Sequence, residues 1–161
     1  MTVYAWISLA PWVPTAKKDL ERINKIADLK PGQTFLEIGC GNGRVCTYIA
    51  KENPENKIIG IELAFPFYLF VKIKTALFGP GNLEVIFGDA LKFDISKVDS
   101  IYVFGLIETV NGVLKRKIEK EMPPNSKFIS YVFSMKEWDG VQATYGGDKE
   151  RKIHAYAKET P

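Results

Sequence analysis

The feature that most constrains the fold is the run FLEIGCGNGRV at residues 35–45, where three glycines at alternating positions follow a short apolar stretch. The apolar stretch predicts a buried strand, and the residues from Arg44 to about Glu52 predict a helix that ends before Asn53 and Pro54. Glycines at a strand-to-helix turn allow the backbone to approach a ligand beside the helix N-terminus. The run therefore predicts an α/β protein with a nucleotide site at this turn.

Helical and strand-like segments alternate along the rest of the chain, which is typical of βαβ units and a mostly parallel sheet. The last two strand segments have no helix between them, so we predict that they form an antiparallel hairpin at one end of the sheet. Thr15 is the expected N-cap of the first helix. The predicted helices cover residues 15–29, 44–52, 65–78 and 108–122, and the predicted strands cover 34–39, 57–63, 83–89, 99–105, 127–133, 141–145 and 151–159.

A chain of 161 residues is about the size of one domain. We expect a single domain over residues 1–161, in which an apolar segment at 1–14 precedes an α/β core at 15–161. The 22 basic and 19 acidic residues give a net charge of +3. That excess is too small to indicate binding to nucleic acid, and we expect no nucleic acid partner.

The two cysteines, Cys40 and Cys46, flank the glycine turn. They form neither a disulfide framework nor a zinc spacing, and His154 is the only histidine, so no metal site is expected. We predict that both cysteines are small core or turn residues and that the protein is cytoplasmic, where thiols stay reduced.

The N-terminal residues MTVYAWISLAPWV are apolar but lack the basic start and the cleavage site of a secretory signal. They are also shorter than the roughly 20 residues that span a bilayer. We expect this segment to cover a cleft, with an interface or the remnant of a membrane anchor as alternatives.

Three acidic residues near the predicted strand ends indicate which nucleotide binds. The glycines are spaced G-x-G-x-G, and Arg44 stands where a dinucleotide fingerprint has its third glycine. Glu37 lies at the end of the first strand, Glu62 ends the second, and Asp89 follows the third. Such a ring of carboxylates suits a cationic, phosphate-free nucleoside better than a dinucleotide, with Glu62 placed to accept hydrogen bonds from ribose hydroxyls.

The runs LEIGCGNG, GIEL, FGDA and IYVFG, in this order over about residues 34–105, resemble the motifs of class I S-adenosylmethionine-dependent methyltransferases. The resemblance implies a Rossmann-like fold with a mostly parallel seven-stranded sheet and a C-terminal antiparallel hairpin. It implies S-adenosylmethionine as cofactor and S-adenosylhomocysteine as product. By the same resemblance the cofactor-binding residues are Thr15, Glu37, Gly39, Cys40, Gly41, Glu62, Leu63, Asp89, Ala90 and Phe104.

Within that cofactor set, the resemblance implies a role for each group. Gly39 and Gly41 would border the methionine part of the cofactor, and Glu62 would bind the ribose. Asp89 and Ala90 would flank the adenine.

The segments PWVPT at 11–15 and 98–138, and the compact size, look similar to the small protein-lysine methyltransferases of archaea and mitochondria. This resemblance implies N-methylation of a lysine in a protein substrate. The fourth strand is followed by Phe104 and Gly105. It thus lacks the Asn- or Asp-Pro-Pro-aromatic turn of DNA amino-methylating enzymes and the Pro-Cys nucleophile of cytosine C5 enzymes.

The chain departs from the lysine-methylating family after Ser130, where Tyr131 and Val132 replace the usual histidine and acid. A lysine must lose its proton from a pKa near 10.4 before it attacks, and we name Glu108 and Tyr131 as candidate catalytic groups. The alternatives are a methyltransferase acting on a small molecule or a lipid-associated acceptor, and a non-catalytic S-adenosylmethionine-binding subunit.

The predicted helix at 65–78 has apolar residues nearly all round. Such a helix is buried on more than one side, by the N-terminal segment, by a second copy of the chain or by lipid. A homodimer or a membrane-surface contact through this helix and the N-terminal segment is therefore a possible association. Lys72 and Lys74 must reach solvent along its surface.

Overall fold

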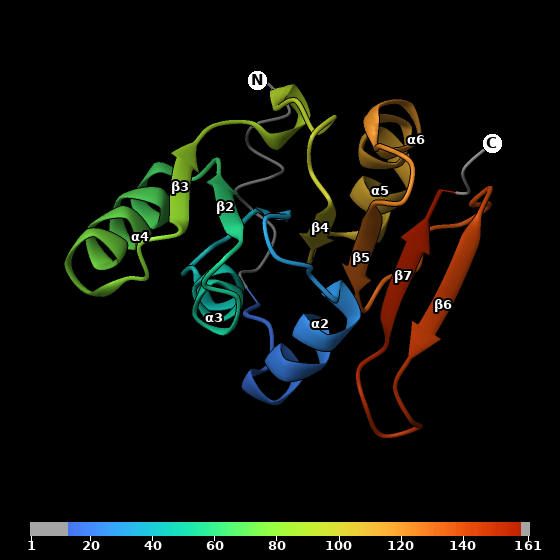
Figure 1. Cartoon of the computed structure of the whole chain (residues 1–161). Coiled ribbons are helices and arrows are strands. Elements are labelled where there is room, and N and C mark those ends of the chain that lie inside the picture. The colour runs from blue at the N-terminus through green and yellow to red at the C-terminus, as the bar shows by residue number, and fades with distance from the viewer. Residues whose placement is uncertain (1–12, 159–161) are drawn as a thin grey trace.

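The computed structural model describes residues 13–158 and contains one seven-stranded sheet with strand order β3-β2-β1-β4-β5-β7-β6 (Figure 1). Strands β1 to β5 pair in parallel, whereas β7 is antiparallel to both β5 and β6. The fold and the C-terminal antiparallel hairpin are therefore as predicted. The strands are β1 (Thr34–Ile38), β2 (Lys57–Glu62), β3 (Leu83–Phe87), β4 (Ser100–Val103), β5 (Lys127–Tyr131), β6 (Val141–Tyr145) and β7 (Ile153–Ala157).

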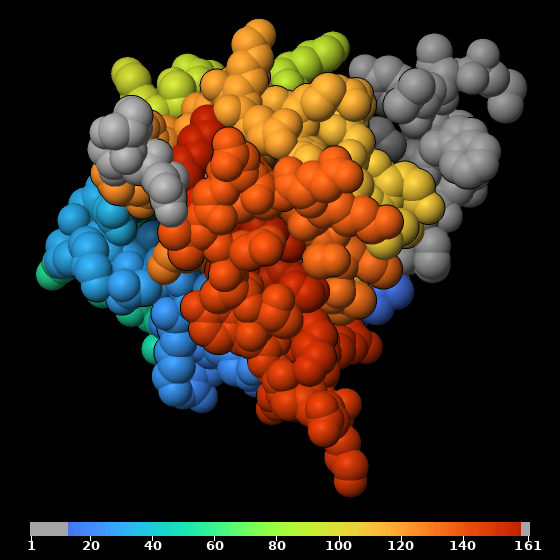
Figure 2. All heavy atoms as spheres, turned by 90° about the vertical axis from the view of Figure 1, so that its right-hand side faces the viewer, coloured from blue at the N-terminus to red at the C-terminus, as the bar shows by residue number. Residues whose placement is uncertain are grey.

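The central strands are short apolar runs because helices cover both faces of the sheet. In β4 every residue is buried, in β2 and β5 all but the first residue are, and in β1 all but the first and the last are. Continuous burial is characteristic of parallel strands between two helical layers. By contrast all five residues of β6 are exposed, because β6 is the edge strand, and Figure 2 shows that its hairpin with β7 forms the surface at this end of the sheet.

Three helices, α2 (Leu20–Ala27), α3 (Arg44–Glu52) and α4 (Phe65–Phe78), cover one face of the sheet. The other face is covered by α5 (Ile107–Thr109), a π-helical turn at Val110–Leu114 and α6 (Lys115–Glu121), together with a 3₁₀ turn at Ala90–Lys92. Helices α3 and α4 have the predicted bounds.

Two sequence-based expectations about the helices are wrong. The segment 15–29 begins as a 3₁₀ turn at Lys17–Asp19, and Ala16 rather than Thr15 occupies its N-cap position. The Thr15 hydroxyl is instead hydrogen-bonded to the hydroxyl of Tyr102 at 2.7 Å. The segment 108–122 is not one helix, because Gly112 has non-helical angles of φ −106° and ψ −113°.

Helix α4 presents apolar side chains both to the sheet and to solvent. Within this helix Val71 is buried, whereas Lys72 and Lys74 reach solvent as expected. The expectation that the N-terminal segment covers a cleft falls on residues 1–12, which lie outside the described residues. Among residues 13–158 no helix is long and apolar enough to cross a membrane.

Candidate active site

The predicted site residues converge where the parallel strands β1 to β5 end. The carboxyl ends of parallel strands meet at one edge of the sheet, and ligands of open α/β folds bind outside this edge. The glycine turn follows β1 here, and Glu62 is the last residue of β2. Asp89 follows β3, Phe104 follows β4, and Tyr131 is the last residue of β5.

The glycine turn is held against the neighbouring strand by two hydrogen bonds. The amides of Gly39 and Cys40 both donate to the carbonyl of Ile61, at 2.9 and 3.0 Å. The turn glycines 39, 41 and 43 have φ values of 69°, 52° and 71°, in the left-handed region that favours glycine. At Gly43 a side chain is also excluded sterically, because a Cβ atom would lie 2.6 Å from a methyl carbon of Val71 in α4.

Glu62 connects the end of β2 to the glycine turn. Its carboxylate accepts a hydrogen bond from the Gly41 amide at 2.7 Å through Oε2 and one from the Ala64 amide at 2.8 Å through Oε1. Each carboxylate oxygen can accept more than one hydrogen bond, so both retain acceptor capacity toward a ligand hydroxyl. A Cβ added at Gly39 or Gly88 would meet no atom within 4 Å, so the turn and the end of β3 leave space beside this carboxylate. These residues fit an adenosyl cofactor.

Glu37 is a buried acid beneath the same turn. Its Oε2 accepts a hydrogen bond from the Cys46 amide in the first turn of α3, at 2.8 Å. Burial raises the pKa of Glu37 to about 8. The hydrogen bond from Cys46 acts to lower this pKa, and the charge of Glu62 acts to raise it further. Near neutral pH the Glu37 side chain is therefore mostly protonated in the folded protein without ligand.

The raised pKa of Glu37 predicts a pH dependence of stability. Between the ordinary pKa of 4.5 and the folded value of about 8, the folded protein holds a proton that the unfolded chain has released. The free energy of unfolding should therefore fall as the pH rises through this window. Glu37→Gln should remove this dependence, which amounts to about 5 kcal/mol for a shift of this size, as measured by urea unfolding at several pH values. A variant whose pH profile parallels that of the unsubstituted protein would contradict the assignment.

The segment after β3 holds the next predicted group. The Asp89 carboxylate accepts a hydrogen bond from the Leu91 amide at 2.9 Å and so caps the turn that begins at Ala90. Phe87, the last residue of β3, is half exposed and packs edge-on against the ring of Phe65, with centroids 5.5 Å apart. Leu63, which lies between β2 and α4 in the chain, is partly exposed.

A second group of predicted residues lies toward β4 and β5. Thr15 is buried, and its carbonyl accepts a hydrogen bond from Arg44 at 2.8 Å in addition to the hydroxyl contact with Tyr102. The ring of Phe104 packs edge-on against Tyr131, with centroids 4.9 Å apart. Cys40 is a buried free thiol within the turn.

The structure places the two candidate catalytic residues in different environments. Tyr131 is fully buried, and its hydroxyl donates to Asp19 Oδ2 at 2.6 Å. Burial and this hydrogen bond raise the pKa of Tyr131, so it remains a neutral phenol. Glu108 is exposed in α5. None of the contacts described for residues 13–158 joins these two side chains.

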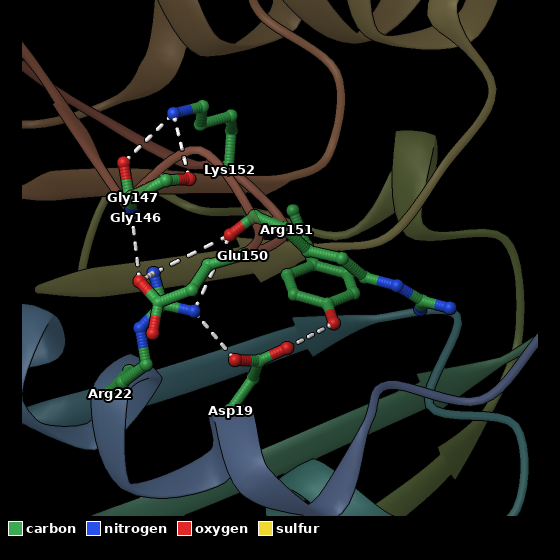
Figure 3. A network of polar contacts seen from close by, with 8 residues as sticks. Asp19, Arg22, Gly146, Gly147, Glu150, Arg151 and Lys152 are labelled. Carbon is green, nitrogen blue, oxygen red and sulfur yellow. Dashed lines mark hydrogen bonds and ion pairs between the residues drawn. The ribbon is translucent and has the colours of Figure 1, made fainter.

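Sequence reasoning missed a polar network that extends from Asp19 through Arg22 to the turn between β6 and β7 (Figure 3). Asp19 is 1% exposed and forms an ion pair with Arg22 at 2.6 Å. Arg22 in turn contacts the carboxylate of Glu150 at 3.5 Å, in the turn between β6 and β7. Burial acts to raise the pKa of Asp19, but the hydrogen bonds from Tyr131 and Arg22 and the charge of Arg22 outweigh it, and the pKa is lowered. The i, i+3 spacing of Asp19 and Arg22 was the only signal in the sequence.

Sequence reasoning also missed the structural role of Asn111, which joins the segments after β4 and β5. Its side-chain amide donates to the carbonyl of Ser134 at 3.0 Å, and its oxygen accepts from the amide of Lys136 at 2.6 Å. This bridge fixes the two segments that border the β4–β5 side of the site. Among the residues described, no three acidic, histidine or cysteine side chains group as metal ligands would.

Comparisons with known proteins show similarity to several methyltransferases. A protein-lysine N-methyltransferase of Saccharolobus islandicus is 28% identical over 141 residues, which are 84% of this chain and 84% of that protein. An (S)-tetrahydroprotoberberine N-methyltransferase of Eschscholzia californica is 33% identical over 110 residues, which are 66% of this chain but 31% of that protein.

A solved structure shares the fold at low sequence identity. It is an RNA methyltransferase from Salinibacter ruber in complex with S-adenosyl-L-homocysteine, with a TM-score of 0.82 and 20% identity over 92% of this chain and 95% of that chain. The family model described as the ANTKMT methyltransferase domain matches residues 37–142, which run from Glu37 in β1 to β6. The chain therefore belongs to the ANTKMT methyltransferase family and is an S-adenosylmethionine-dependent methyltransferase of class I fold.

Proposed function

We propose that the chain transfers a methyl group from S-adenosylmethionine to the ε-amine of a lysine in a protein. The observation that carries this proposal is the similarity to a protein-lysine N-methyltransferase over 84% of both chains. We further propose that the reaction takes place in a reducing compartment such as the cytoplasm, in keeping with the two free, buried cysteines.

The cofactor is proposed to bind along the carboxyl edge of the sheet. Glu62 would bind the ribose hydroxyls through its remaining acceptor capacity, and the backbone of the glycine turn would border the methionine part. The ionised α-amine of the methionine part would favour the charged form of Glu37 and lower its pKa on binding. The proposed binding residues are Thr15, Glu37, Gly39, Cys40, Gly41, Glu62, Leu63, Asp89, Ala90 and Phe104.

Methyl transfer from a sulfonium is an in-line displacement, and the bound cofactor supplies the reactive methyl group. The protein's contribution is to orient the acceptor amine and to exclude water. We propose that Tyr131 acts here by holding Phe104 and the segment around Asp19 in place, since its hydroxyl proton is committed to Asp19. Glu108, an exposed carboxylate in the segment after β4, is proposed to accept the proton that leaves the lysine ammonium.

The experiment is to incubate the purified full chain with radiolabelled S-adenosylmethionine and whole-cell extract. We expect label in protein bands, and methyllysine after acid hydrolysis. The matched control is the same extract after its lysines have been blocked by chemical acetylation, which should accept no label because an amide nitrogen is not a nucleophile.

Three other outcomes would contradict lysine methylation. Label in small molecules or in the organic phase would favour a small-molecule or lipid-associated acceptor. The supporting observation is the similarity to an (S)-tetrahydroprotoberberine N-methyltransferase. Label removed by ribonuclease would indicate an RNA acceptor. Cofactor binding without transfer to any fraction would indicate a non-catalytic subunit.

A further inference from the structure

The outward side of α4 is an apolar strip. Phe65, Leu69, Ile73 and Leu77 follow one another at every fourth position and therefore share one side of the helix. With Phe70 and Phe78 they are between 42% and 82% exposed in the described part of the chain. We call these six residues the α4 strip. Large exposed apolar patches of this kind mark interaction sites on soluble proteins.

Positive charge borders the α4 strip on both sides. Lys72 and Lys74 precede and follow Ile73, so each projects about 100° to one side of it. Lys72 Nζ lies 3.4 Å from the carbonyl of Val85, and Lys74 Nζ lies 6.0 Å from the ring centre of Phe70, so both amines sit at the margin of apolar surface. Helix α4 carries no acidic residue.

We propose that the α4 strip docks on an anionic lipid surface, with α4 lying in the plane of the membrane interface. An apolar strip flanked by lysines is the arrangement of interfacial helices, which bury the strip beneath the headgroups while the lysines meet anionic lipid. At 14 residues the helix is about 21 Å long, too short to span the hydrocarbon core. A second copy of the chain fits the strip less well, because two α4 helices packed together would bring lysines near lysines with no acid of α4 to pair them.

The position of α4 gives this docking a functional consequence. Helix α4 begins three residues after Glu62, so its N-terminus lies at the carboxyl edge of β2. Docking would hold that edge near the membrane surface. The proposal does not depend on which acceptor is methylated.

The test is co-sedimentation of the full chain with lipid vesicles. We expect binding to phosphatidylglycerol vesicles that weakens with added salt, and weaker binding to phosphatidylcholine vesicles. Ile73→Ser should reduce the affinity about tenfold. Lys74→Gln should reduce it about fivefold on the anionic vesicles and leave binding to the neutral ones unchanged.

Val141→Ser is the matched control. Val141 is 57% exposed against 52% for Ile73, and it lies in β6 at the opposite edge of the sheet from β3 and α4. This variant should bind vesicles as the unsubstituted chain does. Leu77→Ser serves as a second strip variant, and thermal unfolding of each variant shows that it is folded.

Four results would overturn the proposal. The first is vesicle binding that neither Ile73→Ser nor Leu77→Ser weakens, and the second is an equal loss in Val141→Ser. The third is a dimer in light scattering that Ile73→Ser converts to a monomer, since the strip would then belong to a second copy. The fourth is binding lost in Trp6→Ser but unchanged in both strip variants, since the N-terminal segment would then be the anchor.

Discussion

Glu62→Ala is expected to bind S-adenosylhomocysteine about a hundredfold more weakly than the unsubstituted chain, as measured by calorimetric titration. The substitution removes the proposed partner of the two ribose hydroxyls. It also releases the amides of Gly41 and Ala64, which the carboxylate now holds at 2.7 and 2.8 Å. Hydrogen bonds to an ionised group contribute about 1.5–3 kcal/mol each, so losing even a part of this set accounts for the expected change.

Two further variants test whether the charge of Glu62 contributes to binding and whether the effect is specific to the site. Glu62→Gln keeps one acceptor oxygen and should lose about tenfold in affinity, between the unsubstituted chain and the alanine variant. Glu55→Ala removes an exposed glutamate in the turn before β2. This turn lies at the amino end of the strand, whereas the site lies at the carboxyl end, so the variant should bind normally. If folded Glu62→Ala retained full affinity, the ribose assignment would have to be abandoned.

Asp19→Ala is expected to lower the free energy of unfolding by about 3 kcal/mol. Asp19 is almost fully buried and bonds both Arg22 and the hydroxyl of Tyr131. Its removal takes this partner from the phenol and leaves Arg22 with the longer, more exposed contact to Glu150. Tyr131→Phe should cost only about 1 kcal/mol, because the ion pair with Arg22 remains. Urea unfolding at neutral pH measures both values.

Glu21→Ala is the control for the Asp19 variant. Glu21 also forms an ion pair, with Lys25 at 2.6 Å, but both side chains are exposed, and its loss should change stability little. The double variant Asp19→Ala with Tyr131→Phe should be less destabilised than the sum of the single effects, because each removes the same hydrogen bond. Strict additivity would show that this bond does not contribute to stability.

Local pattern was sufficient to predict most of the fold. Each central strand is a short apolar run between turn residues, and the bounds of α3 and α4 follow from the glycine turn, from Asn53-Pro54 and from Gly79-Pro80. The break at Gly112 was not predictable in this way, because the apolar spacing continues through it. The neighbouring Asn111 is hydrogen-bonded to Ser134, 23 positions later in the chain.

The same distinction applies to the site, where positions at strand ends were predictable and contacts between distant residues were not. Glu62 and Asp89 end or follow consecutive strands, and a parallel sheet necessarily brings such positions to one edge. The partner of Tyr131 could not be inferred, since Asp19 lies 112 positions earlier in the chain and no periodicity connects them. Thr15 illustrates the same limit. The local sequence predicted a helix cap, but the Thr15 hydroxyl is hydrogen-bonded to Tyr102 in β4.

The glycine turn owes its shape to groups that are distant in the chain. Its amides are held by the carbonyl of Ile61 and the carboxylate of Glu62, which come into register only when β1 and β2 have paired. The unfolded chain therefore contains no preformed version of this turn. A ligand that needs the turn can bind only the native state, so it draws the folding equilibrium toward that state by mass action. In a cell, the supply of cofactor would then regulate how long the protein survives as well as how fast it works.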